Sequence, residues 1–223
     1  MEKITKDNIL FSIFYAIAYQ DIEMIQLLME YSNKNNIILV LNEKDRNNQF
    51  SLLGAIINNN IEMIQSLMDY ANEYNIILKL NEKDIDNTYS LLEAVYNNNI
   101  EIIQLLMDYS NKNNIILELN EKDEKGYYPL SYACYMNNIE MVQLLMEYAN
   151  KHNIILELNG KNNNYVYFLL IYEEEKHNSI IKMNLINACK NGNRRKIKQL
   201  IEENDYSKIC NKYIIYIKFS IHN

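Results

Sequence analysis

The sequence predicts an all-α solenoid of stacked helix–turn–helix repeats, with short β-turn tips. Two series of residues indicate the repeat, because a fixed period between 20 and 50 residues is typical of solenoids. Isoleucines followed by glutamate, and asparagines near the end of each copy, recur every 39 residues: Ile22, Ile61, Ile100 and Ile139, and Asn42, Asn81, Asn120 and Asn159. Each copy also contains two apolar patterns with helical spacing. The expected repeats span about 10–44, 45–83, 84–122 and 123–161.

The composition is typical of a folded chain that binds neither nucleic acid nor membranes. Of the 223 residues, 48% are apolar, which is enough to build a core. The net charge of -7 opposes binding to nucleic acid phosphates and to anionic membrane surfaces. The cysteines Cys134, Cys189 and Cys210 show no pairing pattern, so a reducing compartment is expected. We expect the cytoplasm, with the nucleus as the alternative.

The first repeat begins almost directly with a helix. Its apolar segment 9–19 follows two lysines and contains an Ala-Ile-Ala sequence, a pattern that also fits a secretory signal peptide. However, Ile13, Ala16 and Ile17 fall in phase with apolar residues of the next copy. We therefore favour a first core helix, and eleven residues are too few to span a bilayer.

The second repeat shows the pattern of every copy. A polar turn over 45–50 precedes a short helix over 51–58, and two or three asparagines follow. The second helix begins after Asn60, a good N-cap, and Glu62 lies where the helix dipole favours a negative charge. The apolar residues are spaced as on one helix face: Leu52, Ala55 and Ile56, then Ile61, Ile64, Leu67, Met68 and Ala71.

Local signals mark the ends of the other helices. Ser90 and Glu93 match a capping box at the start of the third repeat's first helix. Pro129 takes the first-turn position of the corresponding helix in the fourth repeat, where a missing N–H costs nothing. With only four glycines, the chain is expected to use asparagine in the left-handed conformation. The second helices should end this way before a short extended run, at Asn75, Asn114 and Asn153.

The pattern weakens toward the C-terminus. Residues 162–183 form a degenerate fifth copy, and 184–204 form a closing helix pair that is out of period. The tail over 205–223 alternates weakly between apolar and polar residues, which fits either an extra strand or a frayed end.

The fourth copy resembles an ankyrin repeat, which is a β-turn followed by two helices with a Thr-Pro-Leu-His-x-Ala motif. The resemblance covers roughly residues 10–204, and Gly192 matches the glycine between the family's helices, where other copies have Asn59, Asn98 and Asn137. The matching residues are Asp123, Gly126, Tyr128-Pro129-Leu130-Ser131-Tyr132-Ala133, Asn137, Glu140, Val142, Leu144 and Leu145.

The copies depart from the family in two ways. The usual period is about 33 residues, so each copy has about six more, placed after the second helix. The family's Thr and His are also absent, and apolar packing should replace their hydrogen bonds. The residues at these positions are Phe50, Tyr89 and Tyr128, and Leu53, Leu92 and Ser131.

The resemblance implies partner binding through a concave face of turn tips and first helices. Residues at these positions differ between copies, and several are apolar or aromatic, as in a binding surface. Free drift of exposed positions after duplication is the alternative. The predicted partner-binding residues are Arg46, Gln49, Ile57, Asn58, Ile85, Thr88, Tyr96, Asn97, Glu124, Lys125, Tyr127, Tyr135 and Met136, with Tyr96, Tyr127 and Tyr135 as anchors.

Other motifs point to structure rather than to chemistry. Glu173 to His177 lacks a second ligand at helical spacing, so a solvated helix end is favoured over a metal site. Cys134 and Cys189 align with core positions, and His152 and His222 have no catalytic partner nearby in the sequence. A basic cluster fits the polar face of a capping pair, with a phosphate or acidic-partner site as the alternative: Lys190, Arg194, Arg195, Lys196 and Lys198.

These observations predict a non-catalytic, monomeric scaffold that binds another protein, without a cofactor or metal ion. Two alternatives remain open. The chain is a structural segment of a larger or decayed repeat protein, because its first and last copies lose the pattern. The other alternative is an enzyme, which a ligand-dependent shift in melting temperature would indicate.

Overall fold

The computed structural model describes residues 6–136, 138–157, 195, 199 and 215–216. The chain packs as two compact blocks. The N-terminal block comprises Met1–Glu118 and Lys122–Gly126, and the C-terminal block comprises Leu119–Glu121 and Tyr127–Asn223. The described part of each block contains the helix pairs that the repeat predicts.

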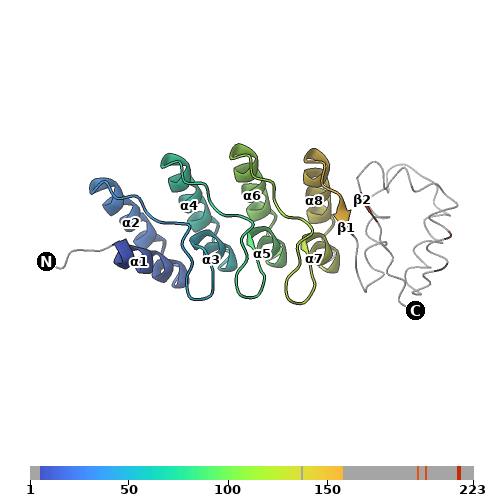
Figure 1. Cartoon of the computed structure of the whole chain (residues 1–223), viewed down its shortest axis with the longest axis horizontal. Helices are drawn as coiled ribbons and strands as arrows, with labels where there is room; N and C mark the ends of the chain where they lie inside the picture. The colour runs from blue at the N-terminus through green and yellow to red at the C-terminus, as the bar shows by residue number, and fades with distance from the viewer. Residues whose placement is uncertain (1–5, 137, 158–194, 196–198, 200–214, 217–223) are drawn as a thin grey trace. The chain divides into compact units, whose positions relative to one another are not determined.

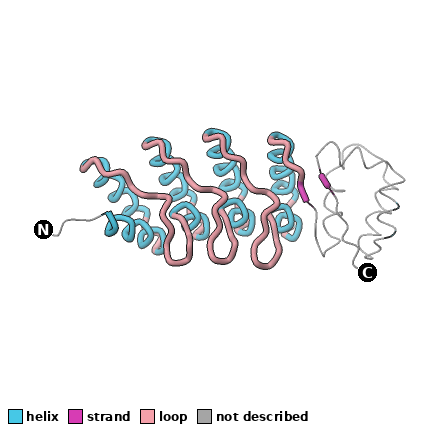
Figure 2. Tube along the Cα trace, viewed as in Figure 1, coloured by secondary structure: helices cyan, strands magenta, loops and turns pink. Residues whose placement is uncertain are grey.

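The N-terminal block contains three helix pairs in two rows (Figure 1). The first helices, α1, α3 and α5, pack side by side, and so do the second helices, α2, α4 and α6. Extended segments and projecting turn tips connect successive pairs (Figure 2). The helices are α1 (Lys6–Ala18), α2 (Ile22–Lys34), α3 (Ser51–Ile57), α4 (Ile61–Glu73), α5 (Ser90–Tyr96) and α6 (Ile100–Lys112).

The C-terminal block contains the fourth helix pair, α7 (Pro129–Tyr135) and α8 (Ile139–Lys151). Two short strands, β1 (Leu156–Glu157) and β2 (Ile215–Tyr216), pair in parallel. The expected fifth copy, closing helix pair and most of the tail lie outside the described residues. In the part of the chain that is described, no helix has the length and apolar character needed to cross a membrane.

The second helices begin where the sequence predicts. The side-chain oxygen of each N-cap residue accepts a hydrogen bond from the backbone N–H three positions later, which satisfies a donor that the helix leaves unpaired. A glutamate follows in the first turn of each of these helices. The N-caps and their donor–acceptor distances are Asp21 at 2.9 Å, Asn60 at 3.0 Å, Asn99 at 3.2 Å and Asn138 at 3.0 Å.

Asparagine supplies the left-handed backbone conformation at three places in the repeat, because it tolerates positive φ better than most residues. The predicted helix ends are confirmed, with φ of 54° at Asn75, 55° at Asn114 and 56° at Asn153. Asn59 and Asn98, between the two helices, both have φ of 54°. The turn tips use the same conformation at Asn48, Asn87 and Gly126.

The predicted capping box at Ser90 is wrong. Helix α5 begins at Ser90, so the N-cap is Tyr89, which makes no side-chain capping bond. The ring of Tyr89 is fully buried, so this N-cap residue belongs to the core. The prediction for Pro129 is confirmed, because Pro129 is the first residue of α7. In that helix the Ser131 hydroxyl accepts a hydrogen bond from the Tyr128 N–H at 2.8 Å.

The core forms from the apolar faces of both helix rows. Ile13, Ala16 and Ile17 of α1 are buried, which confirms the first core helix. The positions of the missing Thr and His motif residues are also buried, and aliphatic or aromatic side chains occupy all of them except Ser131, whose hydroxyl bonds to the Tyr128 backbone. These residues are Phe50, Tyr89 and Tyr128, and Leu53, Leu92 and Ser131.

Periodic hydrogen bonds join each repeat to the next. The Asn42 amide donates to the Ile77 carbonyl at 2.7 Å and accepts from the Lys79 N–H at 3.3 Å. Asn81 makes the same pair of bonds one repeat later, to Ile116 at 2.7 Å and Glu118 at 3.1 Å. The asparagine that marks the period is therefore a clamp on the extended segment of the following repeat.

Candidate partner-binding surface

An aspartate side chain organises each of the first two turn tips. One carboxylate oxygen of Asp45 accepts the N–H groups of Asn47 and Gln49, both at 2.8 Å. In the next tip an oxygen of Asp84 accepts the N–H groups of Asp86 at 3.0 Å and Thr88 at 2.8 Å. These local bonds let a polar loop keep one conformation without burying apolar side chains.

Neighbouring tips are also tied to one another within the N-terminal block. The Ile85 N–H donates to the Asn47 carbonyl at 3.2 Å, and the Glu124 N–H donates to the Asp86 carbonyl at 3.3 Å. The Gln49 side chain donates to Asp84 at 3.4 Å. The tips therefore form a continuous, ordered edge beside the row of first helices.

The predicted site residues of the N-terminal block lie on this edge and on α3 and α5. Large apolar side chains that face solvent are unusual unless a partner covers them. Ile85 and Tyr96 are of this kind, and they are among the more exposed large hydrophobic residues of the described chain. Arg46, Glu124 and Lys125 are exposed beside them, and Gln49, Ile57 and Thr88 are half-buried.

Asn58 and Asn97 form hydrogen bonds between repeats, which the sequence analysis did not predict. The Asn58 amide donates to the Ile17 carbonyl at 2.7 Å, and the Asn97 amide donates to the Ile56 carbonyl at 2.8 Å. Each bond joins a first helix to the first helix of the preceding repeat. Both residues are half-buried, so they link the row of helices while they form part of its surface.

The predicted residues of the C-terminal block form an aromatic cluster. The Tyr127 ring stacks on Tyr132 with 4.7 Å between centroids and lies 6.4 Å from Tyr135 in a tilted arrangement. Tyr135 is exposed, and Met136 is half-buried after it. Aromatic side chains gathered this way lose little conformational entropy on binding, which suits them as anchors of an interface.

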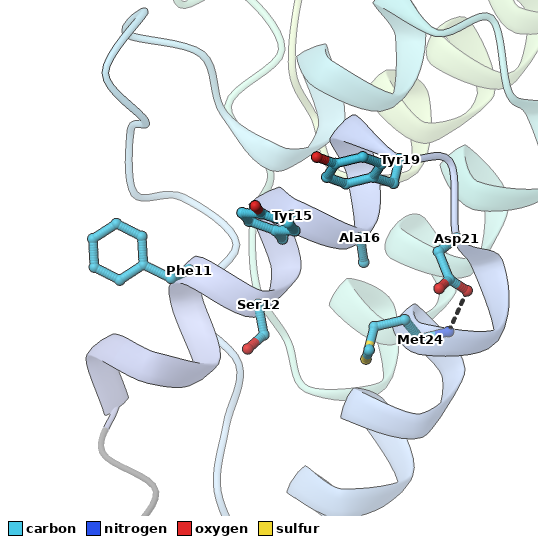
Figure 3. A pocket seen from close by; sticks show the side chains of 7 residues that line it. All are labelled: Phe11, Ser12, Tyr15, Ala16, Tyr19, Asp21 and Met24. Atoms are coloured by element: carbon cyan, nitrogen blue, oxygen red, sulfur yellow. Dashed lines mark hydrogen bonds between the residues drawn. The ribbon is translucent and has the colours of Figure 1, made fainter.

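An open pocket of about 310 Å³ lies on α1 and the start of α2 (Figure 3). The Tyr15 and Tyr19 rings stack at 5.0 Å, and the Asp21 carboxylate is held by the Met24 N–H. The sequence prediction missed this site. Tyr19 is in register with Asn58 and Asn97, so extending the comparison of copies to the first repeat would have found it. The lining residues are Phe11, Ser12, Tyr15, Ala16, Tyr19, Asp21 and Met24.

Burial raises the pKa of several ionisable groups, among them Glu93 and Cys134. The pKa of the Glu93 carboxyl, on α5, is raised by burial and further by the nearby negative charge of Asp84. Burial raises the pKa of the Cys134 thiol to about 12, which leaves it a buried apolar side chain rather than a nucleophile, as predicted. Among the described residues no group of three or more His, Cys, Asp or Glu is arranged to hold a metal ion.

Several motifs fall outside the described residues. They are the segment Glu173 to His177, four of the five basic residues near 190–198, and the residues Asn137, Cys189, Gly192, Cys210 and His222. Of the basic cluster, only Arg195 is described, and it is exposed in a helical position. His152 is the C-cap residue of α8, and the centroid of its ring lies 4.2 Å from that of the Tyr148 ring.

Comparison with known proteins agrees with the geometry. Residues 55–155 match a family model described as ankyrin repeats in three copies. The match spans most of the second repeat, the third repeat and most of the fourth, including α4, α5 and α6. A search of curated proteins found no match.

Proposed function

We propose, from the premise that this chain is an ankyrin repeat protein, that it is a scaffold that binds another protein through its turn tips and first helices. Ankyrin repeats generally serve as protein–protein interaction modules, and the family is typically non-enzymatic. The observation that carries the proposal is the exposure of Ile85, Tyr96 and Tyr135 on ordered elements. Rigid, exposed aromatic and aliphatic residues are the usual anchors of an interface.

The proposed contact residues are those predicted from the sequence. Tyr96 is the anchor in the N-terminal block, with the adjoining tip residues as a polar rim. Tyr127 and Tyr135 are the anchors in the C-terminal block. Asn58 and Asn97, in the N-terminal block, also hydrogen-bond through their side-chain amides to backbone carbonyls of the preceding first helix. We therefore expect their substitution to affect stability as well as binding.

The chemistry of the chain favours a protein partner over other classes. With a net charge of -7, the chain should bind neither nucleic acid nor anionic membranes. We propose that it acts as a monomer without a cofactor, in the cytoplasm or the nucleus, in keeping with its lack of paired cysteine spacing.

The test is affinity capture from a lysate of the source cell. Wild type is compared with the triple variant Tyr96→Ala, Tyr127→Ala and Tyr135→Ala. A matched control, Ile77→Ala, Ile116→Ala and Ile155→Ala, removes three exposed apolar side chains away from the tips and first helices. Circular dichroism confirms that all three proteins are folded.

We expect a partner that wild type and the control retain and the tyrosine variant loses. Equal capture by all three proteins would reject this surface as the binding site. Loss with the isoleucine variant alone would instead move the site to the extended segments between repeats.

A further inference from the structure

Several side chains of the first repeat are exposed, although the residues at the same positions in later repeats are buried. We call Phe11, Met24 and Tyr31, with Tyr15 and Tyr19, the leading face. Phe11 is 63% exposed, whereas its counterpart Phe50 is 2% exposed. Met24 is 43% exposed against 0% for Met63, and Tyr31 is 37% exposed against 3% for Tyr70. The later residues are buried because a preceding repeat packs against them.

The leading face is unlike the outer face of a terminal repeat. Terminal repeats of solenoids normally carry a polar outer surface, which keeps the end soluble. The leading face, which no repeat covers among the described residues, instead carries three aromatic rings and a methionine around an open pocket (Figure 3). Leu27 of α2 is also exposed. A concentrated apolar patch of this kind marks an interaction surface.

The leading face also keeps the hydrogen-bonding groups of the interface between repeats. Tyr70 uses its hydroxyl to receive the Leu39 N–H at 3.1 Å and to pair with the Ser32 hydroxyl at 3.0 Å, both from the preceding repeat. Tyr31 stands at the same position in the first repeat. In the second repeat, the Ile77 carbonyl and the Lys79 N–H bond to the Asn42 side chain of the preceding repeat. Ile38 and Val40 occupy the same two positions in the first repeat.

We propose that the leading face docks the trailing face of an ankyrin-type repeat carried by another protein. The trailing face is the side of a repeat that packs on its successor. The interface between the first and second repeats defines the chemistry that it must present: a serine like Ser32, an asparagine like Asn42 and the free N–H of a leucine like Leu39.

The first-helix half of the leading face narrows the choice of partner. The position of Tyr15 holds Gly54 in the second repeat, where an added Cβ would lie 3.0 Å from the Ile17 side chain, and Glu93 and Tyr132 in the third and fourth. Tyr19 replaces Asn58, which holds the Ile17 carbonyl of the preceding repeat. The partner therefore meets two stacked tyrosines beside the pocket at this position.

The test joins one extra repeat, a copy of residues 84–122, to the N-terminus of the full chain. A Gly/Ser linker of about 15 residues, with a mean end-to-end distance of roughly 20 Å, lets the repeat dock without forcing it. Oxidation of Met24 by dilute peroxide is followed by mass spectrometry. A linked segment of the same composition in scrambled order is the control.

We expect Met24 oxidation to slow by about tenfold, which is the protection that an effective concentration on the order of 1 mM gives when the Kd of docking is about 0.1 mM. The copied repeat should become helical at the same time, since one repeat does not fold alone. Met24 that stays as reactive as with the scrambled segment would overturn the proposal.

Two substitutions test the geometry of docking. Asn120→Ala in the added copy removes the clamp, and Tyr31→Phe in the chain removes the receiving hydroxyl. Both should restore much of the Met24 reactivity, whereas Glu118→Ala in the copy, which removes only an exposed side chain, should not. Full protection in both substituted proteins would reject the assigned interface. The test uses α1 and α2 alone and is independent of the tyrosine variant above.

Discussion

The hydroxyl of Tyr70 accepts a hydrogen bond from the backbone N–H of Leu39 at 3.1 Å. The same bond recurs between Tyr109 and Leu78 at 3.2 Å. In both places the donor lies in the extended segment of one repeat and the acceptor on the second helix of the next. A buried N–H without a partner costs about 1–3 kcal/mol, so this tyrosine holds successive repeats together.

Substitution Tyr70→Phe should lower the free energy of unfolding by about 1–3 kcal/mol, because it leaves the Leu39 N–H buried and unpaired. Urea denaturation followed by circular dichroism measures the change. The matched variant Tyr31→Phe, in the repeat with no predecessor among the described residues, should change stability by less than about 0.5 kcal/mol. Equal effects of the two substitutions would contradict the assigned role of the hydroxyl.

Substitution Asn81→Ala should cost about 1–3 kcal/mol of stability, because it removes both bonds of the clamp on Ile116 and Glu118. Chemical denaturation is again the measurement. Glu118→Ala is the control, since it keeps the backbone N–H and removes only an exposed side chain. A clamp variant as stable as this control would show that the bonds contribute nothing.

The left-handed conformation of Asn75, with φ of 54°, makes opposite predictions for two small residues. Asn75→Gly should stabilise the chain or leave it unchanged, whereas Asn75→Ala should destabilise it by about 1 kcal/mol, because alanine is strained at positive φ. Thermal melts of the two variants side by side measure the difference. The reverse order would reject backbone strain as the reason for asparagine here.

Glu93 should make stability fall as the pH rises. Its pKa is raised in the folded state, so the folded chain holds this proton more tightly than the unfolded chain does. The ionised Glu93 carboxylate destabilises the folded chain. This destabilisation is absent below the ordinary carboxyl pKa of about 4.3 and complete above the raised pKa of Glu93. Glu93→Gln should therefore raise the Tm at pH 7 and leave it unchanged near pH 3.5.

The control for this pH dependence is Glu118→Gln, because the Glu118 side chain is exposed and lies outside the helices. It should leave the Tm unchanged at both values of pH. A Glu93→Gln variant whose Tm gain is the same at pH 7 and pH 3.5 would show that packing, not ionisation, causes the effect.

Cys134 should resist alkylation in the folded chain at pH 8, because its thiol is buried and its pKa is raised to about 12. Peptide mass spectrometry after iodoacetamide treatment isolates this cysteine from the other two. Labelling should begin only when denaturant unfolds the protein. Rapid labelling of the native chain would show that the helix pair α7 and α8 opens easily.

Most of the fold could be predicted from the sequence because each local signal, such as a capping asparagine, recurs in several copies of the repeat. Asn60 and its counterparts cap helices wherever they occur, and Asn75 and its counterparts end them. The capping box at Ser90 failed because the register of a helix start was decided by the burial of the Tyr89 ring. Composition gives no measure of that packing.

The candidate site was less predictable, since it depends on contacts between repeats. Asn58 and Asn97 were predicted to be surface residues because their position holds Met136 in the fourth copy, yet their amides bond to the preceding first helix. The proximity of Asp84 to Glu93 depends on how the tip folds against α5. The pocket at Tyr15 and Tyr19 was missed because the first repeat departs from the pattern of the others.

The spacing of the bonds between repeats has an evolutionary consequence. In the N-terminal block, the clamp joins residues 35 and 37 positions apart, and the tyrosine joins residues 31 apart. An in-frame recombination that removes or inserts 39 residues brings equivalent partners to the same places. Such a chain can change its number of repeats without acquiring a new interface, so its length is free to evolve while each junction stays the same.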